Sequence, residues 1–171
     1  MYEELRNAWT ELTSPGQMFE IATIDVRGAP MRSYAHAPAS LRDIWQGTVA
    51  HADREYLIYQ QERCTYIQAH EFTASISNWL SKQGVQKGDR VAIAMRNYPE
   101  WMLAYWAITS MGAVAVGMNA WWVPHEMHYA LEDAAPKVLI CDKERLLRFE
   151  EIRQDFPNII ITAVRLEDEA P

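Results

Sequence analysis

The sequence predicts an α/β fold in which helices flank a mostly parallel β-sheet. Two observations indicate this fold class. From Gly88 onward, strand-like and helix-like segments alternate, and the alternation includes four strands. These strands are continuous apolar runs, which is typical of strands that helices cover on both faces. We therefore expect an irregular leader over residues 1–39, an α/β subdomain over residues 40–165 with βα repeats over residues 88–165, and an acidic, frayed end over residues 166–171.

The leader is predicted to hold one short helix and one strand. The helix pattern over residues 2–12 ends at Ser14-Pro15-Gly16, because proline and glycine interrupt helices. Residues 18–28 alternate loosely between apolar and polar side chains, which predicts a strand with a turn at Gly28.

The subdomain is predicted to start with a helix after Ser40, which is a favourable N-cap residue with Asp43 three positions later. A strand over residues 56–60 comes next, and residues 61–63 turn the chain. In the helix after Ser40, four side chains share one face and are predicted to point inward: Leu41, Ile44, Trp45 and Val49.

The next helix has the clearest start signal in the sequence. Thr65 and Gln68 fit the capping box, in which each side chain satisfies a backbone donor near the other residue. The helix should reach about Gln83, and Gly84 suits the left-handed position that follows a helix. Its inward side chains are predicted to be Phe72, Ile76, Trp79 and Leu80.

Three helices separate the four strands of the repeats. Pro99 suits the first turn of the first helix, which ends at Gly112. The second helix covers residues 124–133. Asp142 is predicted to cap the third, which runs to about residue 154 with Leu146, Leu147, Phe149 and Ile152 inward. The strands cover residues 90–95, 113–116, 137–141 and 159–164.

Residues 101–124 carry no charged or histidine side chain and are long enough to span a bilayer. The helical part nevertheless ends at Gly112, and Gly112 and Gly117 bracket a β-branched run. We therefore predict no membrane span, and a buried helix in which Trp101 and Trp106 belong to the core.

Composition excludes several classes of function. The net charge is −7 and the sixteen Lys and Arg residues are scattered, so no basic stripe exists for nucleic-acid binding. Cys64 and Cys141 make neither a disulfide framework nor a zinc knuckle, and are predicted to be buried thiols in a reducing cytoplasm. The charged N-terminus has no apolar segment of the kind that signal peptides contain.

No motif predicts an active site. The glycine spacing that starts at Gly112 resembles a phosphate-binding P-loop but lacks the lysine and the hydroxyl residue that must follow. His125 and His128 lie one residue too close for the H-E-x-x-H zinc motif. The mixed charges from Asp142 to Arg145 are typical of a solvated helix end. We therefore predict no catalytic, cofactor-binding or metal-binding residue within this chain.

Three blocks nevertheless resemble the N-terminal part of the adenylate-forming (AMP-binding) enzymes, most like a fatty-acid or acyl-CoA ligase. Residues 65–101 are similar to the family's T-Y-x-x-L block, G-V-x-K-G-D-x-V-A strand and N-x-x-E-W helix start. Residues 107–140 resemble the block with a glycine-alanine turn before a strand, and residues 14–45 resemble the leader of fatty-acid CoA ligases. The resemblance implies a partial N-terminal subdomain of the acyl-CoA synthetase fold. The residue types in these blocks suit scaffold roles. Gly88 suits a tight turn into a strand, and Gly112 suits the end of the buried helix. Asn97 is predicted to satisfy free backbone groups between strand and helix, and Asn119 to brace the loop after the next strand.

The resemblance also implies a reaction for the intact enzyme. A carboxylate attacks the α-phosphate of ATP to give an acyl-adenylate and pyrophosphate, and the CoA thiol then displaces AMP. ATP, magnesium and CoA are the implied cofactors. In the family, a Ser/Thr/Gly-rich loop ending in Pro-Lys-Gly holds the phosphates, and a lysine from a mobile C-terminal domain drives adenylation. This sequence contains neither, so we expect an inactive fragment that binds none of these cofactors.

Two hypotheses therefore stand side by side. The first is an N-terminal fragment of an ATP-dependent carboxylate–CoA ligase, with the remainder of the same enzyme and a carboxylic acid, a fatty acid in particular, as its partners. The second is a free-standing, non-catalytic α/β scaffold or association module. An unpaired strand edge would suit the second hypothesis and also a homo-oligomer, because such an edge can pair with another chain.

Overall fold

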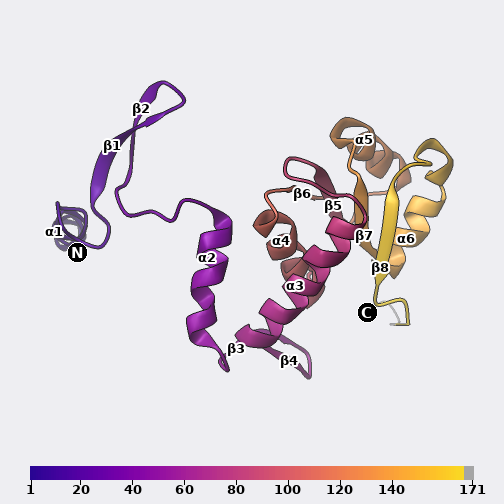
Figure 1. The fold of residues 1–171 in the computed structure, drawn as a ribbon, viewed down its shortest axis with the longest axis horizontal. Helices are drawn as coiled ribbons and strands as arrows, with labels where there is room; N and C mark the ends of the chain where they lie inside the picture. Colours follow the sequence, from indigo (N-terminus) through magenta and orange to yellow (C-terminus); the bar gives the residue numbers. More distant parts are fainter. Residues whose placement is uncertain (168–171) are drawn as a thin grey trace. The chain divides into compact units, whose positions relative to one another are not determined.

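The computed structural model describes residues 1–167, and the chain divides into two compact units, Met1–Ser40 and the residues from Leu41 onward (Figure 1). Of the acidic end expected over residues 166–171, residues 168–171 lie outside the described part of the chain.

The first unit combines a helix with a β-hairpin. Helix α1 (Tyr2–Leu12) precedes strands β1 (Ile21–Val26) and β2 (Ala29–Tyr34), which pair antiparallel. Arg27 and Gly28 connect the strands with φ of 54° and 86°, as two-residue hairpin turns with two left-handed residues require. The helix, β1 and the turn were predicted, but β2 was not. Its sequence contains Pro30, and proline is depleted in strands.

The second unit begins with a helical segment and a second hairpin. Helix α2 (Leu41–Gly47) continues into the 3₁₀ turn η1 (Thr48–His51), and β3 (Glu55–Tyr59) pairs antiparallel with β4 (Glu62–Thr65). Helix α3 (Tyr66–Lys82) follows at once. The predicted capping box is present, since Thr65 N donates to Gln68 Oε1 over 2.9 Å and Gln68 N donates to Thr65 Oγ1 over 3.4 Å.

The remaining elements form a doubly wound parallel sheet. Strands β5 (Arg90–Ala94), β6 (Val114–Gly117), β7 (Val138–Asp142) and β8 (Ile160–Val164) lie in the order β6-β5-β7-β8, and every neighbouring pair is parallel. Helices α4 (Pro99–Ser110), α5 (Pro124–Ala134) and α6 (Lys143–Glu150) connect them, with the 3₁₀ turn η2 (Arg153–Asp155) before β8. The predicted fold class is confirmed.

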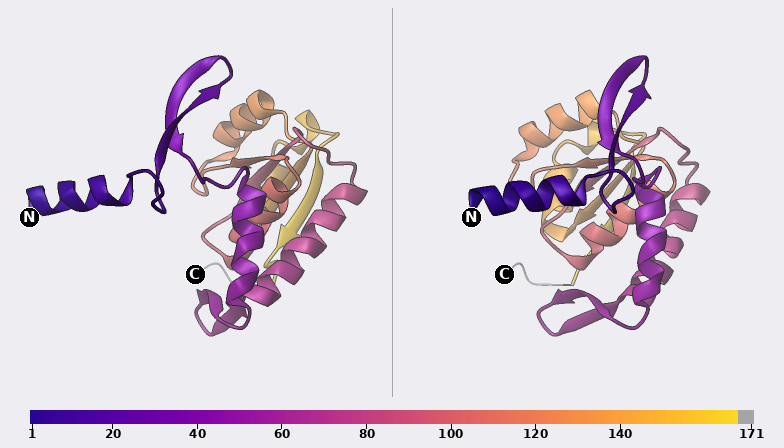
Figure 2. Two further views of the ribbon diagram at one scale, coloured as in Figure 1. Left: turned by 60° about the vertical axis from the view of Figure 1, so that its left-hand side comes forward. Right: turned by 90° about the vertical axis from the view of Figure 1, so that its left-hand side faces the viewer.

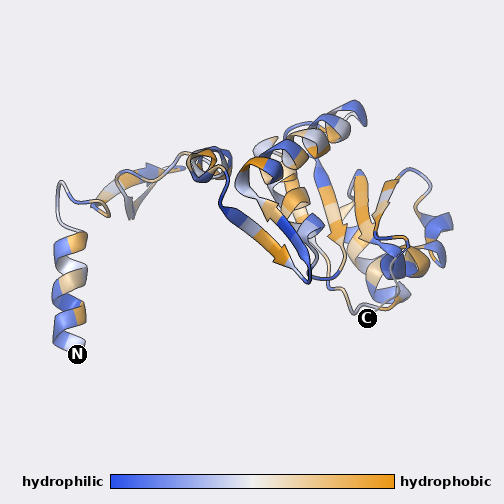
Figure 3. Ribbon diagram, turned by 90° about the horizontal axis from the view of Figure 1, so that it is seen from below, coloured by the Kyte–Doolittle hydropathy of each residue, from blue (hydrophilic) through white to orange (hydrophobic). Residues whose placement is uncertain are grey.

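Helices cover the sheet on both faces (Figure 2), and each face has its own core. On one face Val91 and Ile93 of β5 pack with Leu80 of α3 and Ile108 of α4. On the other face Ala92 and Leu139 pack with side chains of α5 and α6: Met127, Leu131 and Phe149. Because alternate residues of a strand point to opposite faces, both faces need apolar residues. This requirement explains the continuous apolar strands, which Figure 3 colours as hydrophobic.

Several predicted helix faces are rotated or shortened. In α2 only Trp45 is buried, while Leu41 and Ile44, and Val49 in the following turn η1, are exposed. In α3 the buried face is formed by Ala69, Thr73 and Leu80, and Phe72 is exposed. Helix α6 ends at Glu150 rather than near residue 154, and Leu147 is exposed. Apolar spacing defines a stripe, but the neighbouring elements determine which part of the stripe they cover.

The apolar helix α4 has the predicted bounds, but two of its side chains are less buried than predicted. It starts at Pro99 and ends before Gly112, which has φ of 76°. Trp101 and Trp106 are only partly buried, so their predicted place in the core is corrected. Both rings stack on other aromatic residues, Trp101 on Tyr105 and Trp106 on Trp45. No helix within residues 1–167 is both long enough and apolar enough to cross a membrane.

Candidate functional site

The order of the strands places a ligand crevice at the carboxyl ends of β5 and β7. From β5 the chain passes through α4 to β6 on one side, whereas from β7 it passes through α6 to β8 on the other. Neighbouring strands whose connections leave in opposite directions open a crevice between their carboxyl ends, where ligands of such sheets bind. The loops that follow β5, β6 and β7 meet at this edge.

A buried ion pair occupies the centre of this edge. The side chains of Asp142, at the end of β7, and Arg145, in α6, are 4% and 1% exposed, and Arg145 Nη1 lies 3.0 Å from Asp142 Oδ2. Asp142 also accepts from the backbone N of Arg96 over 3.0 Å and from the backbone N of Arg145 over 3.0 Å. The predicted helix cap at Asp142 is confirmed. The predicted solvated helix end is wrong, because two charged side chains of this run are buried against each other.

Arginines of α6 also fix the loop between β6 and α5. Arg145 Nε donates to the carbonyl of Ala120 over 2.7 Å, and Arg148 Nη1 donates to the same carbonyl over 3.0 Å and to that of Trp122 over 2.8 Å. Glu144 balances the charge, since its Oε2 lies 2.9 Å from Arg145 Nη1. Asn119 Oδ1 accepts from the backbone N of Trp121 over 2.9 Å, which confirms its predicted role in bracing this loop.

A first cavity of about 310 Å³ opens beside these loops and is called the cationic cavity. The guanidinium of Arg96 lies over the ring of Trp121 at 5.2 Å, and Trp121 is 67% exposed. Within residues 1–167 no carboxylate forms an ion pair with Arg96, so the cavity carries a positive charge. Its lining residues are Tyr59, Arg96, Asn97, Tyr98, Ala120 and Trp121.

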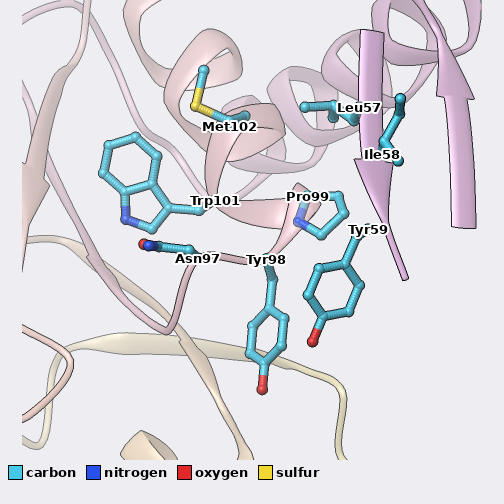
Figure 4. A pocket seen from close by; sticks show the side chains of 8 residues that line it. All are labelled: Leu57, Ile58, Tyr59, Asn97, Tyr98, Pro99, Trp101 and Met102. Carbon is cyan, nitrogen blue, oxygen red and sulfur yellow. The ribbon is translucent and has the colours of Figure 1, made fainter. Parts of the chain in front are cut away.

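A second cavity of about 350 Å³ adjoins the first and is called the apolar cavity (Figure 4). Strand β3 forms one wall with Leu57, Ile58 and Tyr59, and the start of α4 forms the other. The two cavities share Tyr59, Asn97 and Tyr98. The rings of Tyr59 and Tyr98 meet edge to face with centroids 5.5 Å apart, and Figure 4 shows both side chains pointing the same way.

Asn97 lines both cavities, and its side chain makes no hydrogen bond to any residue from 1 to 167. Its expected role in satisfying backbone groups is therefore not observed. Gly88 does have the predicted turn conformation, with φ of 89°, and its N donates to the carbonyl of Gly112 over 3.0 Å. These turns lie at the amino end of the sheet, away from the two cavities.

The histidines and cysteines have structural surroundings. His128 Nε2 lies 3.2 Å from Asp155 Oδ2, and the ring packs against Phe156. Within the described residues, no three His, Cys, Asp or Glu side chains gather as a metal site would require. Both thiols are free. Cys141 is buried in β7, and burial raises the pKa of its thiol to about 12. Cys64 is only partly buried, which corrects the prediction for that residue.

The described residues do not fit an ATP triphosphate or its magnesium ion. A phosphate loop offers consecutive backbone N–H groups, usually from glycines. Here the loop after β6 instead presents the carbonyls of Ala120 and Trp122, which the two arginines of α6 occupy. The carboxylate of Asp142 stands at the crevice itself. This edge thus presents a buried ion pair and two adjoining cavities, and we assign no chemical step to it.

Comparison with known proteins places the chain in a family. Residues 45–170 match the family model for AMP-binding enzymes. The chain is 31% identical over 118 residues to 3-hydroxybenzoate–CoA/4-hydroxybenzoate–CoA ligase of Thauera aromatica, over 67% of this chain and 22% of that protein. It is also 31% identical over 107 residues to medium/long-chain-fatty-acid–CoA/3-oxocholest-4-en-26-oate–CoA ligase of Mycobacterium marinum, over 63% of this chain and 20% of that protein.

Solved structures agree with the sequence match. A crystal structure of an anthranilate CoA ligase in complex with anthranoyl-AMP superposes with a TM-score of 0.71 at 28% identity. The superposition covers 75% of this chain and 26% of that one. The chain thus spans about a fifth to a quarter of the length of these proteins. It belongs to the AMP-binding enzyme family, and its fold matches the N-terminal subdomain of the acyl-CoA ligases.

Proposed function

We propose that this chain is the N-terminal subdomain of an ATP-dependent carboxylate–CoA ligase. The intact enzyme would convert an acid and ATP into an acyl-adenylate and pyrophosphate, and would then form the CoA thioester with release of AMP. One observation carries the proposal: the AMP-binding match extends over residues 45–170, and the relatives along that stretch are named as CoA ligases. The two free thiols support a reducing cytoplasm as its compartment.

The role proposed for this part is structural. It supplies the parallel sheet and the two cavities, while the phosphate loop, the magnesium site and the catalytic lysine come from the rest of the enzyme. The sequence contains no Pro-Lys-Gly, and the edge of the sheet offers carbonyls rather than N–H groups. The chain by itself is therefore proposed to be inactive and to bind none of these cofactors.

The proposed substrate is a carboxylic acid with an apolar body. The resemblance of residues 14–45 to the leader of fatty-acid CoA ligases favours a fatty acid. The relatives include one named for hydroxybenzoates and one named for fatty acids, each at 31% identity. A test must therefore cover both kinds of acid.

Carboxylate-dependent exchange between ATP and pyrophosphate tests this proposal. The 171-residue chain is compared with the polypeptide encoded when the reading frame is followed past the codon for Pro171. Short, medium and long fatty acids, benzoate and hydroxybenzoates are the substrates. We expect exchange only with the longer polypeptide.

Two results would count against it. Exchange by the 171-residue chain that survives repurification would mean that this part holds ATP by itself. A longer polypeptide that folds but exchanges with no acid, or a stop codon after Pro171 with no phosphate loop encoded nearby, would favour the non-catalytic association module.

A further inference from the structure

The hairpin β3–β4 has one anchored end and one projecting tip. Near its base, Leu57 and Cys64 pack into the cluster around Trp45. Its tip is the turn at Gln60, which has φ of 51°. Between base and tip, β3 supplies the wall of the apolar cavity through Leu57, Ile58 and Tyr59 (Figure 4). The position of the tip therefore determines the shape of that cavity.

Arg165 connects this tip to the carboxyl end of the sheet. It follows β8 directly, and its side chain is 12% exposed. Its Nη1 and Nη2 donate to Glu62 Oε1 and Oε2 over 2.8 and 2.7 Å, a bidentate pair with the hairpin. Its Nε donates to Glu100 Oε2 in the first turn of α4 over 3.1 Å. One guanidinium thus joins three segments that are far apart in sequence.

The same guanidinium lies against the wall shared by the two cavities. Its Cζ is 4.9 Å from the ring of Tyr59 and 4.9 Å from the ring of Tyr98. A planar guanidinium can stack on aromatic rings while it donates to carboxylates in its own plane, which a lysine ammonium cannot do. These five residues, Arg165, Glu62, Glu100, Tyr59 and Tyr98, form what we call the Arg165 clamp.

The backbone at Arg165 supports a specific role. Its φ is 51°, in the left-handed region that non-glycine residues seldom adopt. Such a conformation persists when the surrounding contacts over-determine it. Here those contacts are the two rings, Tyr59 and Tyr98, and the two carboxylates, Glu62 and Glu100.

We propose that Arg165 is a positioning residue, which holds the tip of the β3–β4 hairpin against the carboxyl end of the sheet and so forms the Tyr59–Tyr98 wall of both cavities. Without the clamp the tip moves away and the apolar cavity opens along β3. This inference does not depend on the reaction of the intact enzyme, because every contact it uses lies within residues 55–165.

The two cysteines offer a direct test. Cys64 lies on the hairpin, whereas Cys141 lies in the central strand β7. Release of the tip should loosen the packing of the whole hairpin, including its base, where Cys64 is partly buried against the Trp45 cluster. Under native conditions, the rate of reaction with 5,5′-dithiobis(2-nitrobenzoate) at Cys64 therefore reports opening of the hairpin, and the rate at Cys141 reports unfolding of the sheet. We expect Arg165→Ala to raise the rate at Cys64 roughly tenfold, as loss of an ion-pair network and two ring contacts implies. The rate at Cys141 should not change.

Arg153→Ala is the matched control. Arg153 also forms a bidentate pair, with Glu150 over 2.8 Å, and its Cζ lies 5.5 Å from the ring of Phe149. It connects residues only three apart, so its loss should leave the rate at Cys64 unchanged. Arg165→Lys should raise the rate at Cys64 nearly as much as Arg165→Ala. A lysine ammonium supplies the charge, but it reproduces neither the bidentate pair with Glu62 nor the stacking on both rings.

Glu62→Gln provides the second variant. It should raise the rate at Cys64 by a smaller factor, and Arg165→Ala with Glu62→Gln should react no faster than Arg165→Ala alone. An unchanged rate at Cys64 in Arg165→Ala, or an equal rise in Arg153→Ala, would overturn the proposal. If Arg165→Ala exposes both thiols together, Glu62→Gln decides, since it keeps the stacked arginine and its bond to Glu100. No selective rise at Cys64 in that variant would also overturn it.

Discussion

Replacing Arg145 by methionine should remove much of the stability of the second unit. The guanidinium is almost fully buried and donates to Asp142, Glu144 and the carbonyl of Ala120. Methionine fills part of the volume but leaves the carboxylate of Asp142 buried without its counter-charge. Removing one partner of a buried ion pair typically costs about 3–5 kcal/mol. The total free energy of unfolding of a small domain is about 5–15 kcal/mol, so this loss should be a large fraction of it.

A double substitution separates the buried charge from the packing. In Asp142→Asn with Arg145→Met, no unpaired charge remains, and the amide oxygen can still accept from the backbone N of Arg96. The double variant should therefore lose less stability than Arg145→Met alone, by about 1–3 kcal/mol. Urea unfolding, followed by tryptophan fluorescence and circular dichroism, measures each free energy. A loss below about 1 kcal/mol in Arg145→Met, or a double variant less stable than the single one, would refute the reasoning.

Three further outcomes follow from the same structure. Trp45→Ala should lower the free energy of unfolding by about 3–5 kcal/mol, because Trp45 is 3% exposed. Trp121→Ala should change it by less than about 0.5 kcal/mol, and urea unfolding of both variants measures the difference. Thr65→Ala, which breaks the capping box of α3, should cost about 1 kcal/mol in the same assay. The hydrogen bonds from Arg165 lower the pKa of Glu62 in the folded state. The contribution of the ionised Glu62 to stability is therefore present above the unfolded pKa of glutamate and is lost as pH falls through the lower folded pKa. The difference between wild type and Glu62→Gln should accordingly shrink below about pH 4, and a difference that grows in acid would contradict this.

The parts of the fold that the sequence predicts best are those determined by local chemistry. The capping box at Thr65, the proline start of α4 and the cap at Asp142 depend on a few neighbouring residues, and each is present. The four apolar strands are also predictable, because covering helices on both faces demand apolar side chains at every position. Helix faces such as that of α3 are harder, since Phe72 and Ala69 lie on overlapping stripes and only tertiary contacts select one.

The candidate site depends almost wholly on contacts between distant residues. Asp142 and Arg145 look like an ordinary surface pair in sequence. The signal that could have indicated their burial is the position of Asp142 at the end of an otherwise apolar strand. Arg165 is separated from Glu62 by 103 positions, and no local pattern connects them. Such pairs cannot be read from one sequence, because their geometry exists only once the sheet has formed.

Both arginine networks hold loops in place, and neither offers its donors to a ligand. Arg145 and Arg148 donate to carbonyls of the loop after β6, and Arg165 donates to the β3–β4 hairpin, so both networks connect segments that line the two cavities. Binding to a surface that is already ordered avoids the conformational entropy of ordering it. Under the proposed function, the remainder of the ligase would contact this surface. Arg96 differs from Arg145, Arg148 and Arg165, because it forms no ion pair with a carboxylate among residues 1–167 and its guanidinium lies over the exposed ring of Trp121.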